Sequence, residues 1–475
     1  MSPARPQLLR WLLPWIAACA GGLLLGRPAA AQSVWELTPY RIHVLLALGT
    51  APELTPRLQA DLTADLAARV DSLVGPGWDV TLVAAPPRLQ HALATQIDAV
   101  TVESLAKESL TYDKVMLLAV VPDPSGYRVI ARELDVRTRI WSTTAHVPAG
   151  QAAKLRDAAF RALHMGFAPL ARVETVEKRA VTLRLRAAAL PPRDKALAWV
   201  APGDVFQPLL RRNDREGNLR GVVAVPWTFL AVEEVARAEL KCRLHTGIAG
   251  PLSGRRRGRI EQLALAVIPP GKPTRLVLQS RTEPRQALVG YEIYVQSPDN
   301  KPPDFLGRSD WQGSLMIQPT GQPLRVLLVK HGGELLARLP VVPGLRAEAV
   351  ALVPNDDQRL EAEQAITEFQ EMLVDQVTRR ELLLTKARAA LAAKKFDQVE
   401  ALIGELHLLE TPEQLHRKLQ QQQERIVSGD AAIQRRIDTL FSDTRKLLEK
   451  HVKAETIEQL RAQLAAARSN AEKGG

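Results

Sequence analysis

Ser104 and Lys107, in the segment Ser-Leu-Ala-Lys, have the spacing of a nucleophile and its base. On a helix this spacing places the hydroxyl one turn from the amine, as serine acyl-transfer chemistry requires. The sequence has no Lys-Thr-Gly motif and no suitably placed Ser-x-Asn motif. We therefore predict a solvated helix face here, with serine acyl transfer as the catalytic alternative.

Neither metal nor thiol chemistry is indicated by the remaining reactive residues. The nine histidines are scattered, with no pair at i and i+4: His43, His91, His146, His164, His245, His331, His407, His416 and His451. Cys242 lies in an alternating strand pattern without a partner motif, so we predict a small core residue. No glycine-rich phosphate loop follows a predicted strand. The sequence predicts no metal and no cofactor.

Two sets of carboxylates also have structural interpretations. Asp356 and Asp357 begin a helical pattern, where Asn355 or Asp356 is predicted to be the N-cap. Asp299, Asp304 and Asp310 do not have the spacing of an EF-hand loop, so a calcium site is not expected.

The densest charge is in Ser-Gly-Arg-Arg-Arg-Gly-Arg, whose flanking Gly254 and Gly258 predict an exposed loop between strands. A guanidinium binds carboxylate or phosphate through its planar fork, so this loop is a candidate anion contact. The alternative is a solvated turn that prevents pairing at a sheet edge. The candidate residues are Arg255, Arg256, Arg257 and Arg259.

The amino terminus has the pattern of a secretory signal peptide. Arg5 and Arg10 precede an apolar run from Trp11 to Leu25, and small residues end at Ala31. We predict cleavage after Ala31 and export to the periplasm or cell envelope. The alternatives are a lipoprotein signal with Cys19 lipidated, and an uncleaved signal anchor.

Export and charge limit the classes of partner. The net charge of +11 falls to +8 once the three arginines of the signal peptide are removed. This moderate excess favours anionic surfaces and does not require nucleic acid, which an exported protein does not meet. Protein partners in the envelope and a homo-oligomer stay open.

Residues 35–175 predict an α/β layer domain with a mixed sheet. Tyr40–Leu48 is almost continuously apolar, as a strand buried on both faces should be. Helices are predicted at Thr55–Leu73, Pro87–Ser109 and Gly150–Leu170, between strands in the order β-α-β-α-β-β-β-α. This order and the hairpin YRVIARELDVRTRIWST resemble the amino-terminal domain of TolB-type and curli-secretion-type envelope proteins. The resemblance implies docking of partners or neighbouring subunits, without chemistry.

Two β modules are predicted next. Alternation from Lys178 onward, with strands up to Arg275–Ser280, suggests a small barrel or sandwich. The segment VAPGDVFQP resembles the opening of SH3-like barrels. In Gly307–Gly344 three strands are expected, with Asp310 and Gly313 closing a hairpin turn. This stretch resembles prealbumin-like modules of carboxypeptidase-regulatory type, although Ser309 replaces their threonine; the resemblance implies a binding or spacer module.

After Pro354 the pattern becomes helical. Apolar residues form one stripe along the first helix, and a hairpin across Lys394–Asp397 resembles one tetratricopeptide-like unit. Further helices are predicted at Thr411–Val427, Asp430–His451 and Glu455–Ala467.

The sequence thus predicts a multidomain α+β protein with two all-β modules and an all-α carboxyl-terminal region. The expected segments are a signal peptide (1–31), an α/β docking domain (32–177), a small β-barrel or sandwich (178–280), a β-sandwich-like module (281–354) and a helical hairpin or bundle (355–475). The predicted function is a non-catalytic docking or scaffold protein of the envelope. The alternative is a binder of anionic polymer or membrane surface through Gly254–Arg259.

Overall fold

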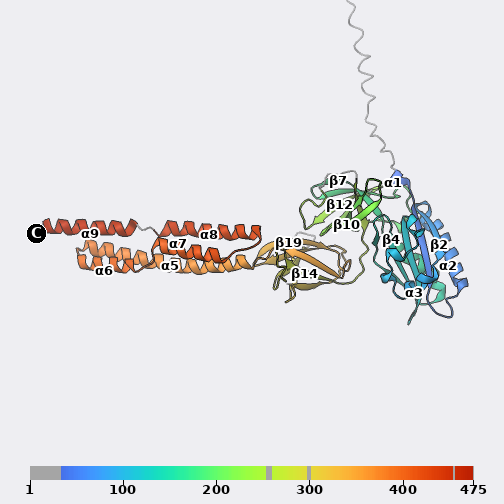
Figure 1. Cartoon of the computed structure of the whole chain (residues 1–475), viewed down its shortest axis with the longest axis horizontal. Coiled ribbons are helices and arrows are strands. Elements are labelled where there is room, and N and C mark those ends of the chain that lie inside the picture. The colour runs from blue at the N-terminus through green and yellow to red at the C-terminus, as the bar shows by residue number, and fades with distance from the viewer. Residues whose placement is uncertain (1–33, 253–258, 297–300, 453–454, 474–475) are drawn as a thin grey trace, which may run out of the picture. The chain divides into compact units, whose positions relative to one another are not determined.

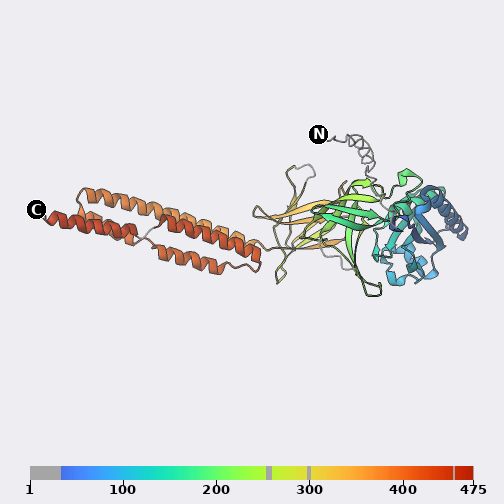
Figure 2. The ribbon, with the colours of Figure 1, turned by 90° about the horizontal axis from the view of Figure 1, so that it is seen from above.

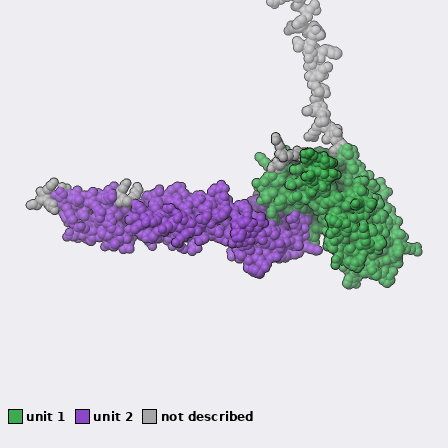
Figure 3. All heavy atoms as spheres, viewed as in Figure 1, with its two compact units in different colours: residues 1–271, 321–324 green, residues 272–320, 325–475 purple. Residues whose placement is uncertain are grey.

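The computed structural model describes the whole chain except residues 1–33, 253–258, 297–300, 453–454 and 474–475 (Figure 1). The described residues form two compact units, coloured separately in Figure 3. One unit contains the residues up to Gly271 together with Gly321–Leu324, and the other contains Lys272–Thr320 and the residues from Arg325 onward.

The first unit begins with a mixed sheet in the order β2-β1-β3-β4-β5, with β6 also paired to β4. Strands β1 and β2 and strands β1 and β3 are parallel, whereas β3 and β4 are antiparallel. As predicted from its apolar run, β1 is mostly buried. The strands are β1 (Tyr40–Leu48), β2 (Trp78–Ala84), β3 (Lys114–Asp123), β4 (Gly126–Asp135), β5 (Ile140–Trp141) and β6 (Ala145–Ala149).

The helices cover the two faces of this sheet unequally. On one face, α2 (Pro56–Arg69) and α4 (Leu155–Gly166) enclose a large apolar core with β1, β3 and β4. On the other face the main helix is α3 (Pro87–Thr95), which is nine residues long. The predicted helix Pro87–Ser109 is therefore wrong beyond Thr95, where 3₁₀ turns at Ile97–Ala99, Val102–Ser104 and Ser109–Thr111 replace it.

Short elements complete this layer. The predicted cap of α2 is confirmed, because Thr55 accepts a hydrogen bond from the Leu58 N–H and Pro56 follows it. The helix predicted for Gly150–Leu170 is shorter at both ends. The remaining elements are α1 (Val34–Leu37), a π turn (Val70–Val74) and 3₁₀ turns at Gly75–Gly77 and Ala152–Lys154.

A closed β-barrel follows in the same unit. Six strands form a ring in the order β9-β11-β12-β8-β7-β13, closed by pairing of β13 with β9, and β10 extends from β9. The alternation in β8 is confirmed, since its apolar residues are buried. The strands are β7 (Leu170–Glu177), β8 (Ala180–Leu185), β9 (Val205–Asn213), β10 (Leu219–Ala224), β11 (Thr228–Ala236), β12 (Glu239–Thr246) and β13 (Ile260–Ala266), with a 3₁₀ turn at Lys195–Leu197.

The second unit begins with two small sheets, ordered β17-β14-β20 and β16-β15-β18-β19. Strand β14, predicted as the last strand of the preceding module, instead pairs with β17 and β20, which lie far along the chain. The three strands expected in Gly307–Gly344 are confirmed. The strands are β14 (Thr274–Ser280), β15 (Glu292–Val295), β16 (Asp304–Arg308), β17 (Ser314–Ile317), β18 (Arg325–His331), β19 (Glu334–Val341) and β20 (Glu348–Val353).

Five helices complete the second unit, and they lie along one another in Figure 2. The 36-residue α5 forms two successive apolar cores, one with α7 and α8 and the other with α6 and α9. The hairpin of α5 and α6 is thus covered by α9, with no stack of repeats. The helices are α5 (Asp357–Ala392), α6 (Phe396–His407), α7 (Pro412–Arg425), α8 (Ala431–His451) and α9 (Glu455–Lys473).

The predicted fold class is confirmed: an α/β layer domain with a mixed sheet, two all-β modules and an all-α carboxyl-terminal region. Among the described helices, none has both the length and the apolar character needed to cross a bilayer.

Candidate functional site

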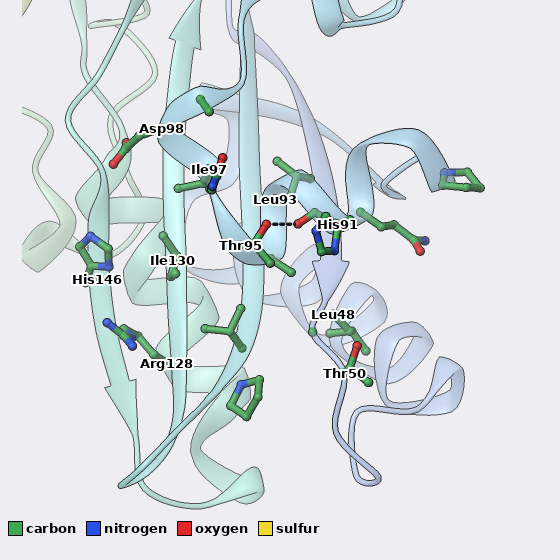
Figure 4. A pocket seen from close by; sticks show the side chains of 18 residues that line it. Leu48, Thr50, His91, Leu93, Thr95, Ile97, Asp98, Arg128, Ile130 and His146 are labelled. Atoms are coloured by element: carbon green, nitrogen blue, oxygen red, sulfur yellow. Dashed lines mark hydrogen bonds between the residues drawn. The ribbon is translucent and has the colours of Figure 1, made fainter.

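A hollow in the first unit lies at the carboxyl ends of the parallel strands β1 and β3 (Figure 4). It has a volume of about 1010 Å³. In open α/β sheets, ligands bind outside the carboxyl ends of the strands, where the connections from neighbouring strands diverge. Here β1 leads to α2 on one face, and β2 leads to α3 on the other. The cleft therefore lies at the end of the sheet where such folds bind ligands, although β3 leads into the antiparallel β4 and not into a helix.

The cleft exists because α3 is too short to cover the sheet. Ile130 of β4 and His146 of β6 are register partners on the face that α3 leaves open. Figure 4 shows His146 and Arg128 on one side of the hollow and His91 on the opposite side. The helix predicted to reach Ser109 would have filled this space.

The cleft has an apolar floor and a polar rim of both charges. Leu93, Ile97 and Val121 are buried, and Leu48 and Ile130 are half-buried. The rim presents Arg128 and two imidazoles together with the Asp98 carboxylate and the Thr50 and Thr95 hydroxyls. A mixed rim of this kind suits a ligand that has apolar side chains and both donors and acceptors, as a polypeptide segment does.

Hydrogen bonds hold one wall of the cleft in place. Arg132 donates through Nη1 to the carbonyls of Ile97 and Asp98, each at 3.0 Å, and its guanidinium lies 4.5 Å from the Trp141 ring centroid. Asp98 also accepts a hydrogen bond from the Thr144 hydroxyl. The 3₁₀ turn that replaces the predicted helix is thus fixed to β4 and to the segment before β6.

Another part of the lining is held by a backbone hydrogen bond and an ion pair. Gly49 donates its N–H to the Val120 carbonyl at 2.7 Å, and a Cβ at this position would lie 3.0 Å from Cδ of Pro122. Arg128 donates through Nη2 to Asp123 at 2.5 Å, across the turn between β3 and β4. Both parts of the lining are therefore formed before any ligand binds.

The residues that line the cleft include no serine, cysteine or lysine, and the hydroxyl groups in the cleft belong to Thr50 and Thr95. The Thr95 hydroxyl donates 2.8 Å to the His91 carbonyl, one helical turn back, and so satisfies its own helix. Within the described part of the chain, no cluster of three or more histidine, cysteine or acidic residues could hold a metal ion.

The predicted Ser104–Lys107 pair does not lie on one helical turn. Ser104 ends the short 3₁₀ turn Val102–Ser104, and its hydroxyl donates to the Thr101 carbonyl at 2.7 Å. Lys107 follows outside that turn and is exposed. The prediction of a helix face at these residues was therefore wrong, and the geometric premise of the acyl-transfer alternative is missing.

Cys242 is the small core residue that its strand pattern predicted. It is buried in β12, and burial raises the pKa of its thiol to about 12. A thiol with this pKa is protonated at neutral pH, so it is a poor nucleophile.

The arginine loop is described only in part. Arg255, Arg256 and Arg257 lie outside the described residues, as do Gly254 and Gly258. Arg259 is exposed immediately before β13, and its carbonyl accepts a hydrogen bond from the Asn213 N–H. The anion-contact hypothesis for this loop stays a prediction.

The acidic pair at the start of α5 anchors the helix in an unexpected way. Asp356 stands at the N-cap position, but its buried carboxylate binds the Arg359 guanidinium at 2.6 Å instead of capping the backbone. The Asn355 side chain accepts from the Asp357 N–H at 3.0 Å. Arg359 also donates to the His331 carbonyl, so the ion pair of Asp356 and Arg359 connects α5 to β18.

The turn at Asp310 is confirmed in its local chemistry and corrected in its role. The Asp310 carboxylate accepts hydrogen bonds from the N–H groups of Gln312 and Ser314, and Gly313 has φ 72°. However, β16 and β17 belong to different sheets, so the turn is a crossover between sheets and closes no hairpin. Of the other two aspartates, Asp304 begins β16 and Asp299 lies outside the described residues.

Sequence reasoning missed the cleft because its residues come from five separate segments. His91 and His146 belong to this shared hollow, although 54 positions separate them and their spacing fits no motif. The strand containing His146 was not predicted, since its Pro148 argues against a strand except at a sheet edge. The usable signal was topological: a strand end, Leu48-Gly49-Thr50, in a predicted β-α-β order.

Comparison with known proteins gives little. No protein-family model matches the chain, and no curated protein matches it. One solved structure that is similar in part is TolB from Acinetobacter baumannii, with 11% sequence identity and a TM-score of 0.17, covering 63% of this chain and 68% of that one. This neighbour fits the TolB-type resemblance loosely. A similarity of this size establishes neither family nor fold.

Proposed function

We propose that the chain is an exported, non-catalytic docking protein of the cell envelope. In this proposal the α/β domain binds a short polypeptide segment of a partner in the cleft at the ends of β1 and β3. The partner is either a neighbouring copy of the chain or another envelope protein. The amino-terminal signal pattern supports export, and the cleft supports docking.

The observation on which the proposal depends is the composition of the cleft. An apolar floor that includes Leu93 and Ile130 lies beneath a rim that has both guanidinium and carboxylate groups. A binding surface gains affinity from its buried apolar centre and specificity from its polar rim. A hollow of about 1010 Å³ has room for several side chains of a partner.

The test compares two exposed alanines in 3₁₀ turns of the same domain. Ala99 lines the cleft, whereas Ala152 does not. Ala99→Arg places a large charged side chain in the opening without removing a buried contact, and Ala152→Arg is the matched control. Chemical crosslinking of the tagged full chain in intact host cells is followed by mass spectrometry of the product.

The expected result is one recurrent partner for the natural chain and the control, and its loss with Ala99→Arg. If both variants capture the partner as well as the natural chain does, docking through the cleft is excluded. The mass of the product separates a second copy of the chain from another protein.

The alternative function is binding of anionic polymer or membrane surface through Gly254–Arg259. It is favoured by the concentration of arginine there and by the exposure of Arg259. Replacing the four arginines with glutamine is expected to release the protein from anionic vesicles, whereas unchanged retention would exclude this alternative. Because the loop and the cleft are mutated separately, the two functions fail independently.

A further inference from the structure

Three guanidiniums surround one indole ring in the first unit. The guanidinium carbons of Arg172, Arg137 and Arg186 lie 4.0, 5.5 and 5.5 Å from the ring centroid of Trp35. The ring is buried, and its Nε1–H donates to the Arg184 carbonyl at 3.1 Å, which fixes its orientation. These groups line a pocket of about 320 Å³ with Val34, Thr38 and Asp113.

The pocket has more positive than negative charge. Asp113 accepts from Arg186 Nη2 at 2.7 Å, and Glu261, close behind, is bound by Arg137 at 2.7 Å and by Arg172 at 3.2 Å. Glu261 is also 3.6 Å from Arg211, a fourth guanidinium. Arg41 lies 3.8 Å from Asp113, so five guanidiniums face two carboxylates and positive charge is left over.

The most buried of the lining guanidiniums also has an unused donor. Arg186 is 7% exposed, and among the described residues its Nε–H has no hydrogen-bond acceptor. Burying a charged donor without an acceptor is costly, and native proteins avoid it unless a ligand or water completes the set. Arg137 likewise has a buried Nε–H without an acceptor in the described chain. Two lining residues thus each have a donor without an acceptor in the described chain.

The apolar side of the pocket limits what the anion is attached to. Val34 is exposed, and the buried Trp35 ring lines the pocket beside the guanidiniums, so the pocket also has an apolar side. A volume of about 320 Å³ lies near the lower limit of small-ligand sites, which span roughly 300 to 1,000 Å³. The space suits a compact ring or short chain that bears one acidic group.

We infer that this pocket binds a small organic anion, with its carboxylate or phosphate between the guanidiniums of Arg137, Arg172 and Arg186 and its apolar part beside Val34 and Trp35. A guanidinium fork recognises both oxyanions through paired N–H groups. The site is separate from the cleft, because no residue lines both. The inference does not depend on the proposed docking function.

The test is calorimetric titration of the full chain at low ionic strength with four probes. Benzoate and phenyl phosphate carry the two oxyanions on one ring, benzamide is the neutral analogue, and inorganic phosphate lacks the ring. The test variant is Arg172→Gln, because Glu261 keeps Arg137 and Arg211 in that chain. The control is Arg41→Gln, which removes a guanidinium that also contacts Asp113 but does not line the pocket.

We expect one saturable site for benzoate or phenyl phosphate, weakened about tenfold or more by Arg172→Gln and unchanged by Arg41→Gln. The stronger of the two probes identifies the preferred oxyanion. Absence of saturable binding by either aromatic anion would overturn the inference, as would equal losses in the two variants. If benzamide binds as tightly as benzoate, charge has no role in binding. If inorganic phosphate binds as tightly as phenyl phosphate, Trp35 has no role. Either result also rejects the inference. Matching circular dichroism spectra establish that each variant is folded.

Discussion

Replacing Lys114 with methionine should destabilise the first unit strongly without affecting the helical region. Lys114 is completely buried at the start of β3, where its ammonium group has three close oxygen partners. Its Nζ donates to Glu133 at 2.7 Å and to the Ala168 carbonyl at 2.5 Å, and lies 3.0 Å from Asp135. The ammonium also lies over the rings of Tyr40 and Phe167. One cation thus serves two buried carboxylates.

The size of the stability loss follows from the two buried carboxyl groups that remain after the substitution. Burial, together with the Asp135 charge, raises the pKa of Glu133 to about 7 even with Lys114 beside it. Without the ammonium, two carboxyl groups share a buried site with no counter-charge. Removing one partner of a buried ion pair costs about 3–5 kcal/mol. With a urea dependence of about 3 kcal/mol per molar for a unit of this size, the midpoint should fall by about 1–1.7 M.

The chain offers separate optical signals for its two units. Among the described tryptophans, Trp311 of the second unit is 77% exposed, and the others belong to the first unit: Trp35, Trp78, Trp141, Trp199 and Trp227. Tryptophan fluorescence therefore reports mainly unfolding of the first unit. Circular dichroism at 222 nm reports mainly the second unit, which contains the 36-residue α5. In Lys114→Met the fluorescence transition should shift and the main dichroism transition should not.

The double variant Lys114→Met, Glu133→Leu is the internal check. It removes one carboxylate with the ammonium, while Asp135 keeps the hydrogen bonds from the N–H and hydroxyl of Thr138. Its midpoint should lie above that of Lys114→Met alone. A loss of less than about 1 kcal/mol in the single variant, or no recovery in the double variant, would refute the reasoning about this buried cluster.

Three further results are expected. Thr411→Ala removes the hydroxyl that accepts from the Gln414 N–H, one half of the capping box, and should cost about 1 kcal/mol in the dichroism transition, whereas an unchanged midpoint would count against the cap. Burial lowers the pKa of His164 below its usual 6.5. As the pH drops below 6.5, His164 therefore takes up a proton more readily in the unfolded chain than in the folded chain, and the folded state loses stability. His164→Gln should lose less thermal stability between pH 7.5 and 5.5 than the natural chain, and equal losses would contradict this cause. Mass spectrometry of the chain from the envelope should find Gln32 as its first residue, and a chain beginning at Met1 in the cytosol would refute export.

Local patterns predicted most of the fold. The apolar run of β1, the Thr55-Pro56 start of α2 and the alternation in β8 each have one dominant local cause, and each is confirmed. The apolar stripe of α5 likewise predicted a packed helix, and its residues form two cores. Periodicity within one segment is sufficient in such cases, because the buried face is determined by neighbours in sequence.

Long-range pairing explains the errors. Alternation identified β14 as a strand but could not show that its partner β20 lies about 70 residues later. The helix predicted beyond Thr95 gives way to 3₁₀ turns whose carbonyls accept hydrogen bonds from Arg132 of β4, a contact that no local pattern contains. The turn that this contact holds lines the cleft, so sequence reasoning missed the contact and part of the candidate site together.

The central claim is that a partner's polypeptide segment binds in the cleft beside α3. The most direct measurement places a photo-reactive residue at Gln96, an exposed lining position, and at Glu216, an exposed position in the turn between β9 and β10. After illumination of intact host cells, Gln96 should give one discrete protein adduct that Ala99→Arg abolishes, and Glu216 should give none. Adducts from Glu216 alone, or an adduct at Gln96 that persists with Ala99→Arg, would contradict docking through the cleft.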